Sequence, residues 1–197
     1  MNDALLFFFL LLLVGCQPNS NPGVKISKAP TNSIAIIQDD YSDAGYCMYE
    51  KSDKDLLTTY PFSKADRIEV VSYPMRKSAY LNSTLIINNK FIVKGIEDRI
   101  KLTDPQIDTL FSILFNYKLK SDKYGMPITD CYTPRHSILF YKNNKVFAFY
   151  EICFDCGGTR QTKDVDFGEF CIEKKCKLQK FFRSVGIKHE IMDDLCL

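Results

Sequence analysis

The clearest pattern in the chain is a pair of apolar runs on either side of Asn143 and Asn144. Residues 136–142 and 145–153 are rich in Ile, Val, Leu, Phe and Tyr, which favour strands. Asparagine tolerates the positive φ angles of a two-residue hairpin turn. The pattern therefore predicts a β-hairpin. Both of its faces are largely apolar, as expected for strands inside a sheet that is covered on both sides.

The turn also predicts the register of this hairpin. If the two asparagines form the turn, His136 lies opposite Glu151, and side chains alternate between the two faces along each strand. His136, Glu151 and Cys153 then share one face at the open end of the hairpin, and Arg135 lies on the other face. A slip of one residue would break the pairing, so this arrangement depends on the turn.

The remaining apolar patterns predict further strands and two helices. Strands are expected at residues 34–38, 46–49, 67–73, 84–87, 90–93 and 100–102, with a second Asn-Asn turn at 88–89. One helix should begin after Thr103, with Gln106 completing a capping box. Another should run from 173 to 185 and end at Gly186. Residues 157–166 are polar and are expected to form an exposed loop. The fold predicted is α+β: an antiparallel sheet of about five to seven strands with two helices packed on it, stabilised by disulfides.

The first fifteen residues predict a targeting signal that is not part of the fold. Residues 4–14 are an unbroken apolar run, too short to span a bilayer as a helix, and the run leads into Gly15 and Cys16. The sequence Leu13-Val14-Gly15-Cys16 resembles a bacterial lipobox. The resemblance covers residues 1–16 and implies cleavage before Cys16 and lipidation of that cysteine. One departure is that no Lys or Arg precedes the apolar run.

The sequence after the signal predicts a tether and one domain. Residues 16–32 contain several Pro, Gly, Asn and Ser residues and little to bury, which is typical of a linker. Residues 33–197 are enough for a single domain with a full core. Gln17, where an inner-membrane retention signal would have Asp, favours the outer membrane by analogy. We expect the domain to be held there by its lipid anchor and to face the periplasm.

The cysteine content fits an oxidising compartment. The chain has eight cysteines, and lipidation of Cys16 leaves seven, which predicts up to three disulfides and one leftover thiol. Spacing does not settle the connectivity, although some pairing among the four at positions 153, 156, 171 and 176 is expected. The residues expected to form bridges are Cys131, Cys153, Cys156, Cys171 and Cys176.

The open end of the central hairpin is the candidate ligand or redox patch. Its residues are Arg135, His136, Glu151, Cys153 and Cys156. The Cys-x-x-Cys pair could be a redox dithiol, or half of a metal site completed by Cys171 and Cys176. Structural disulfides are favoured, because no helix pattern follows Cys156 to lower a thiol pKa. A Cys and His pair oriented by a carboxylate has the form of an activated nucleophile. A cross-strand hydrogen bond between His136 and Glu151 explains the same residues, so no catalytic residue, cofactor or metal is predicted. Arg135 is expected to pair with an acidic side chain rather than to bind an anionic ligand.

The same segment carries a likeness to known proteins. The spaced residues C-Y-x-P-R-H from Cys131, E-I-C-F-x-C from Glu151, and G-x-F-C from Gly168 resemble a group of short bacterial lipoproteins of unknown function. The likeness covers about residues 97–187. It implies that the residues of the patch, together with Cys171, form the signature of the group, and it brings no activity with it.

Charge adds little to this interpretation. The net charge of +2 is scattered, and the nearest approach to a basic cluster, Lys174, Lys175 and Lys177, is interpreted as a solvated helix face, so no nucleic-acid partner is expected. We expect a lipid-anchored envelope protein that acts as a binding or accessory module for an envelope protein or a small periplasmic ligand. The alternatives are a thiol- or metal-dependent enzyme centred on the candidate patch, and an inhibitor or immunity-type protein.

Overall fold

The computed structural model describes residues 45–75, 85–120 and 132–191, which belong to a unit extending from Asp39 to Leu197. The predicted signal and tether, the strand expected at 34–38 and the cysteines at positions 16, 131 and 196 lie outside the described residues.

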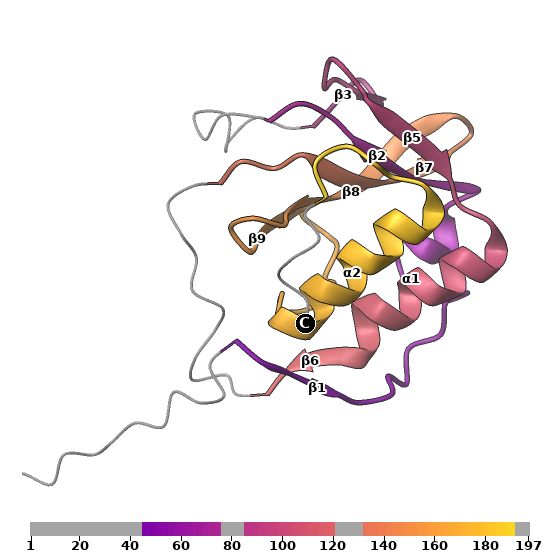
Figure 1. The fold of residues 1–197 in the computed structure, drawn as a ribbon. Coiled ribbons are helices and arrows are strands. Elements are labelled where there is room, and N and C mark those ends of the chain that lie inside the picture. Colours follow the sequence, from indigo (N-terminus) through magenta and orange to yellow (C-terminus); the bar gives the residue numbers. More distant parts are fainter. Residues whose placement is uncertain (1–44, 76–84, 121–131, 192–197) are drawn as a thin grey trace, which may run out of the picture. The chain divides into compact units, whose positions relative to one another are not determined.

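A five-stranded antiparallel sheet with the order β5-β2-β7-β8-β9 carries the fold (Figure 1). The strands are β5 (Asp98–Lys101), β2 (Arg67–Ser72), β7 (His136–Lys142), β8 (Lys145–Cys153) and β9 (Gly158–Gln161). Helices α1 (Asp104–Asn116) and α2 (Ile172–Val185) lie side by side against one face of this sheet. The smaller elements are β1 (Cys47–Tyr49) paired with β6 (Tyr117–Leu119), β3 (Ile86–Ile87) paired with β4 (Lys90–Phe91), and the short 3-10 helix η2 (Phe62–Lys64). The predicted α+β class is confirmed.

The local signals in the sequence form the predicted turns and caps. Both Asn-Asn turns have the positive φ angles that a two-residue hairpin requires, 49° and 61° in the central hairpin and 49° and 58° between β3 and β4. Thr103 caps α1 in a capping box, in which the Gln106 side chain accepts a hydrogen bond from the Thr103 backbone N–H (2.8 Å). Gly186 ends α2 at a φ of 112°.

Apolar side chains cover the central hairpin on both faces, as predicted. On the face toward the helices, Phe140 and Tyr150 pack with Phe62 and with buried side chains of α1 and α2. On the opposite face, Leu139 and Phe149 pack in a second cluster that the segment containing β3 and β4 helps to cover. The strands β7 and β8 therefore lie in the interior of the unit, which is why both of their faces are apolar.

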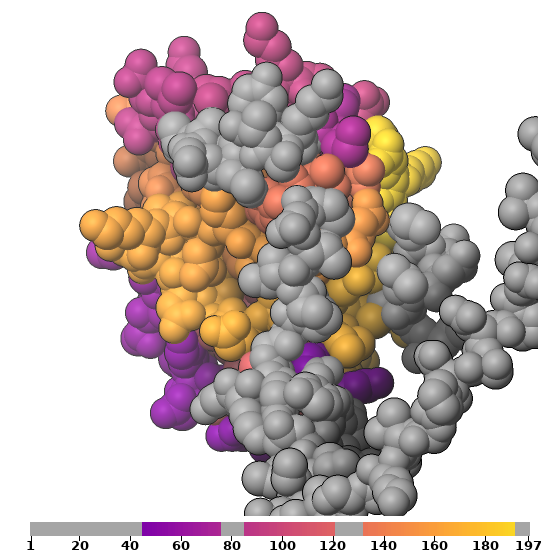
Figure 2. Space-filling view, turned by 90° about the vertical axis from the view of Figure 1, so that its left-hand side faces the viewer, coloured from indigo at the N-terminus to yellow at the C-terminus, as the bar shows by residue number. Residues whose placement is uncertain are grey.

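Within the described residues, one disulfide is local and another joins distant parts of the chain. Cys153 bonds to Cys156, which confirms the expectation of a pairing within the C-terminal group of cysteines. Cys171, at the start of α2, bonds to Cys47 of β1, a residue that was not among the expected bridge formers. In Figure 2 the indigo residues around β1 border the orange residues that lead into α2. Cys176 is also disulfide-bonded.

Two strands were not predicted. The interval 157–166, expected to be an exposed loop, contains β9, which pairs with β8 along the edge of the sheet. Gly158 begins this strand, and a Cβ atom placed there would lie 2.7 Å from the ring of Tyr132, so the close approach requires glycine. The strand β6 follows α1 directly and pairs with β1. β6 has three residues, too few for its alternation to stand out, and β9 has the sequence Gly-Thr-Arg-Gln, which contains no apolar side chain.

Candidate functional site

A β-bulge in the central hairpin divides the predicted patch. Beside the turn the pairing follows the expected register, but Phe147 of β8 is skipped in the pairing with β7. Every later pair is displaced by one residue, so His136 lies opposite Ile152 and Glu151 lies opposite Ser137. A displacement of one residue reverses the face on which a side chain lies. The predicted pairing is therefore wrong, and His136 and Glu151 lie on opposite faces of the sheet.

Glu151 is fully buried on the face away from the helices. Tyr73 donates a hydrogen bond from its hydroxyl to Oε1 (2.9 Å), and Tyr132 donates one to Oε2 (3.2 Å). Arg160 Nη2 of β9 lies 2.9 Å from Oε2. The Tyr73 hydroxyl also lies 2.7 Å from Ser137 Oγ. Because both carboxylate oxygens are engaged, Glu151 joins β8 to Arg160 of β9, to Tyr73 after β2 and to Tyr132 before β7.

His136 is buried on the face toward the helices, beside the C-terminal part of α2. Its Nε2–H donates a hydrogen bond to the carbonyl oxygen of His189 (3.0 Å), and its ring packs against Phe154 and Phe182 at centroid distances of 5.1 Å and 5.8 Å. Burial lowers the pKa of His136 to about 4. The ring is neutral at pH 7 and serves to attach the segment after α2 to the sheet.

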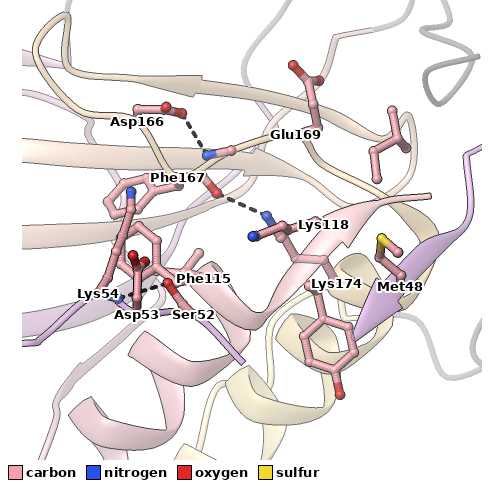
Figure 3. A pocket seen from close by; sticks show the side chains of 14 residues that line it. Met48, Ser52, Asp53, Lys54, Phe115, Lys118, Asp166, Phe167, Glu169 and Lys174 are labelled. Atoms are coloured by element: carbon pink, nitrogen blue, oxygen red, sulfur yellow. Dashed lines mark hydrogen bonds between the residues drawn. The ribbon is translucent and has the colours of Figure 1, made fainter. Parts of the chain in front are cut away.

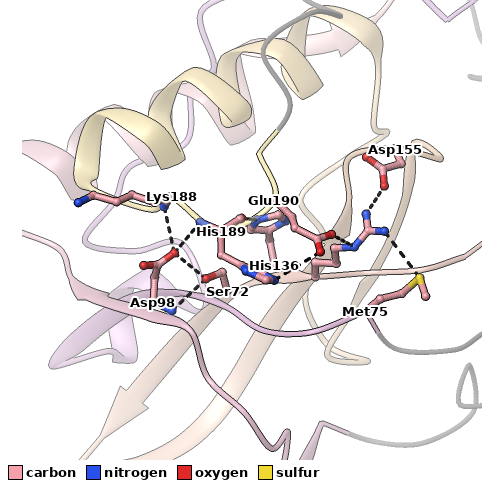
Figure 4. Close-up of polar contacts among 9 residues, drawn as sticks. Ser72, Met75, Asp98, His136, Asp155, Lys188, His189 and Glu190 are labelled. Carbon is pink, nitrogen blue, oxygen red and sulfur yellow. Dashed lines mark hydrogen bonds and ion pairs between the residues drawn. The ribbon is translucent and has the colours of Figure 1, made fainter.

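Two further side chains, Arg135 and Asp98, hold the segment after α2 (Figure 4). Arg135 forms ion pairs with Asp155 and with Glu190, which confirms the expectation that it pairs with acidic side chains. Asp98 Oδ2 accepts hydrogen bonds from the backbone N–H groups of Lys188 (2.9 Å) and His189 (2.8 Å). Burial alone would raise the pKa of Asp98, but these hydrogen bonds lower it below its ordinary value. These contacts account for Arg135 and His136 as structural residues.

The cysteines of the patch are oxidised. Cys153 and Cys156 are buried and joined by a disulfide, and the backbone N–H of Cys156 also contacts Cys153 Sγ (3.3 Å). A zinc site would need these sulfurs, and that of Cys171, as thiolates, so this disulfide and the one from Cys171 to Cys47 are incompatible with the predicted alternative of a four-cysteine site. Within the described ranges, no group of three or more His, Cys, Asp and Glu side chains is placed to hold a metal ion.

A cavity of about 350 Å³ lies elsewhere, beside the first turn of α2 (Figure 3). It is enclosed by the loop after β1, the C-terminal end of α1, β6 and residues 166–169. Its apolar lining consists of Met48, Leu114, Phe115, Tyr117, Leu119 and Phe167; its charged lining consists of Asp53, Lys54, Lys118, Asp166, Glu169 and Lys174. We call this cavity the Lys174 pocket.

Lys174 is the buried charge of this pocket, with 1% of its surface exposed. Its Nζ donates a hydrogen bond to the carbonyl oxygen of Phe167 (2.9 Å), as Figure 3 shows. Burial lowers the pKa of Lys174 to about 8, and the nearby carboxylates of Asp166 and Glu169 oppose that change. The interpretation of Lys174, Lys175 and Lys177 as a solvated face is therefore wrong for Lys174, whereas Lys177 is exposed as expected.

The sequence contained a signal for this burial. Lys174 precedes Leu178 by four residues and Phe181 by seven, so it lies on the same apolar stripe of α2 as these core residues. Its charge favoured the opposite interpretation. A lysine placed on the buried stripe of a helix is the pattern that could have identified the pocket.

Among the described residues, no helix combines the length and the apolar character needed to cross a membrane. Comparison of the chain with protein-family models, with curated proteins and with solved structures finds no match.

Proposed function

We propose that the protein is a lipid-anchored cell-envelope protein whose domain is a binding module, with the Lys174 pocket as its ligand site. The observation that carries the proposal is the pocket itself. Its volume of about 350 Å³ falls in the range of small-molecule sites. Such sites combine apolar walls with a few placed polar groups, and here Leu114, Phe115 and Phe167 form buried walls around the ammonium group of Lys174.

The envelope location is supported by the N-terminal sequence and by the disulfides. The lipobox-like sequence ending at Cys16 supports a palmitate-bearing lipid anchor on the mature chain, and Gln17 favours the outer membrane with the domain facing the periplasm. Disulfides persist in the oxidising periplasm and are rare in the cytosol. The bonds of Cys47 to Cys171 and of Cys153 to Cys156 fit that compartment. The likeness of residues 97–187 to short bacterial lipoproteins also supports an envelope location.

The anchor is tested by following the incorporation of labelled palmitate in bacterial cells that express the full chain. The wild-type chain should take up the label, and Cys16→Ala should abolish the incorporation, because the acylated thiol is missing. Ser20→Ala, in the tether, is the matched control and should keep the wild-type level. Palmitate retained by Cys16→Ala would refute lipidation at this cysteine.

The binding role is tested with a library of small neutral, cationic and anionic fragments. The full mature chain is titrated while backbone amide resonances are followed by NMR. Fragments should shift the amides of the lining residues, including Leu119, Phe167 and Gly168, more than those of the rest of the domain. A library in which no fragment of any charge perturbs these amides would overturn the Lys174 pocket as the ligand site.

An inhibitor or immunity-type protein, or a module that docks on an envelope protein, is the second candidate. The observation that favours it is a group of exposed apolar side chains in and beside β1, with Tyr46, Met48 and Tyr49 exposed by 44%, 45% and 64%. Exposed apolar groups of this kind are typical of protein interfaces. An enzyme centred on Cys153, His136 and Glu151 is not favoured, because a disulfide occupies the sulfur and the other two residues lie on opposite faces.

A further inference from the structure

The carboxylates of Asp166 and Glu169 act on the Lys174 ammonium group only from the exposed rim of the pocket, and neither forms an ion pair with it. It has three N–H donors, and the described residues provide one acceptor, the Phe167 carbonyl oxygen, and no ion pair. It also lies in the first turn of α2, where the helix dipole is positive and disfavours a cation. A buried charge is costly unless it is paired. A negatively charged group bound in the pocket would pair with the Lys174 ammonium group and offset the cost of burying it.

The remaining charged side chains of the pocket lie at its exposed rim. Lys54 is held over the ring of Phe115 at 4.4 Å, and Lys118 forms an ion pair with Glu50 at 3.0 Å. The rim also carries three exposed carboxylates, those of Asp53, Asp166 and Glu169. The rim therefore has no excess of positive charge. This balance suits a ligand with one negative charge and disfavours a phosphate dianion, which proteins hold with several donors or cations.

Gly168 leaves space over the ammonium group. This residue has a φ of 68°, and a Cβ atom at its position would lie 3.6 Å from Lys174 Nζ. A larger side chain would extend from that point across the charged group. The absence of a side chain at Gly168 therefore leaves room beside Nζ, where Lys174 is otherwise 1% exposed.

We propose that the Lys174 pocket binds a small monocarboxylate with an apolar body, whose carboxylate accepts hydrogen bonds from Lys174 Nζ and whose body packs against Phe115 and Phe167. This inference rests on the proposed binding function and names its ligand class. The carboxylate engages the two remaining N–H groups of Lys174, and the rim carboxylates disfavour molecules with further negative charge.

The test compares matched probes on the full mature chain. Benzoate and hexanoate are titrated beside their neutral amides and inorganic phosphate, and the amide resonances of the pocket report binding. For fragments of this size we expect a Kd on the order of 1 mM. We expect each carboxylate to bind at least about tenfold more tightly than the corresponding amide and than inorganic phosphate. This difference is what one charge-assisted hydrogen bond contributes. The comparison uses the wild-type chain and so does not depend on a variant that folds.

The Lys174→Met variant then removes the charge and keeps the aliphatic stem. Its affinity for the carboxylates should fall by at least about tenfold, to the level of the amides. Lys177→Met, on the exposed side of the same helix, is the matched control and should bind as the wild type does. Equal binding of acid and amide in the pocket, or unchanged carboxylate affinity in Lys174→Met, would overturn the carboxylate assignment and leave the binding function standing. If the carboxylates do not shift the pocket but neutral or cationic fragments do, the assignment also fails. If no fragment of any charge shifts it, the proposed function fails as well.

Discussion

Replacing Glu151 by alanine should lower the free energy of unfolding by about 3–5 kcal/mol. The carboxylate is fully buried and is contacted by Arg160 and by the hydroxyls of Tyr73 and Tyr132. Its removal takes one member out of a buried ion pair and leaves two tyrosine hydroxyls without this acceptor, and the loss of one member of a buried pair is strongly destabilising. Urea denaturation under non-reducing conditions at pH 7 measures the change.

Two further variants separate the buried contact from a general effect of lost charge. Glu151→Gln keeps the volume of the side chain and one oxygen acceptor but loses the charge and the second acceptor, so it should cost less than the alanine variant, roughly 1–2 kcal/mol. Glu50→Ala removes an acid from the ion pair with Lys118, in which the side chains are 56% and 50% exposed, and should change the stability by less than about 1 kcal/mol. A Glu151→Ala chain as stable as Glu50→Ala would show that the cluster around Glu151 is not structural.

The elements that the sequence predicts well are those set by neighbouring residues. The capping box of Thr103 and Gln106, the end of α2 at Gly186 and the two Asn-Asn turns each depend on a few adjacent side chains and on local φ angles. Such signals act within one turn of the chain and need no knowledge of what packs on them. The α+β class follows from them together with the apolar periodicity.

The arrangement of the candidate patch could not be predicted, because it depends on one skipped residue. The segment around Phe147 is a run of strand-forming residues, and any of them could be accommodated in a regular ladder. Nothing in its composition marks the bulge. The bulge nevertheless decides whether His136 and Glu151 share a face, since side chains alternate with a period of two.

The contacts between distant segments could not be predicted from the sequence either. Cys47 bonds to Cys171 across a separation of 124 residues, and spacing alone contains no information on such a pairing. Lys174 shows a different difficulty, since its charge and its position on the apolar stripe of α2 make opposite predictions. The packing of residues 166–169 over the start of α2, which the sequence does not reveal, gives its ammonium group an acceptor inside the pocket.

The chain should lose stability as the pH falls from 6.5 to 4 through the burial of His136. Burial lowers the pKa of this residue to about 4 in the folded state, whereas the unfolded chain has the ordinary value of 6.5. Between these values the unfolded chain binds a proton that the folded chain does not, so acid favours unfolding, by about 1.4 kcal/mol per pH unit and roughly 3 kcal/mol in all. Above pH 6.5 the ring is neutral in both states and contributes no pH dependence.

Carboxylates also titrate in this range, so the measurement is the difference between the wild type and His136→Gln. The glutamine amide can still donate to the carbonyl oxygen of His189, but it cannot take up a proton. Urea denaturation from pH 7 to pH 4 should show the wild type losing stability faster than the variant, with the two curves parallel above pH 6.5. NMR of the ring nitrogens provides a direct reading, in which His136 stays neutral well below pH 6. A ring that titrates near pH 6.5, or two curves that stay parallel down to pH 4, would show that water reaches His136 and that its packing between Phe154 and Phe182 does not exclude a charge.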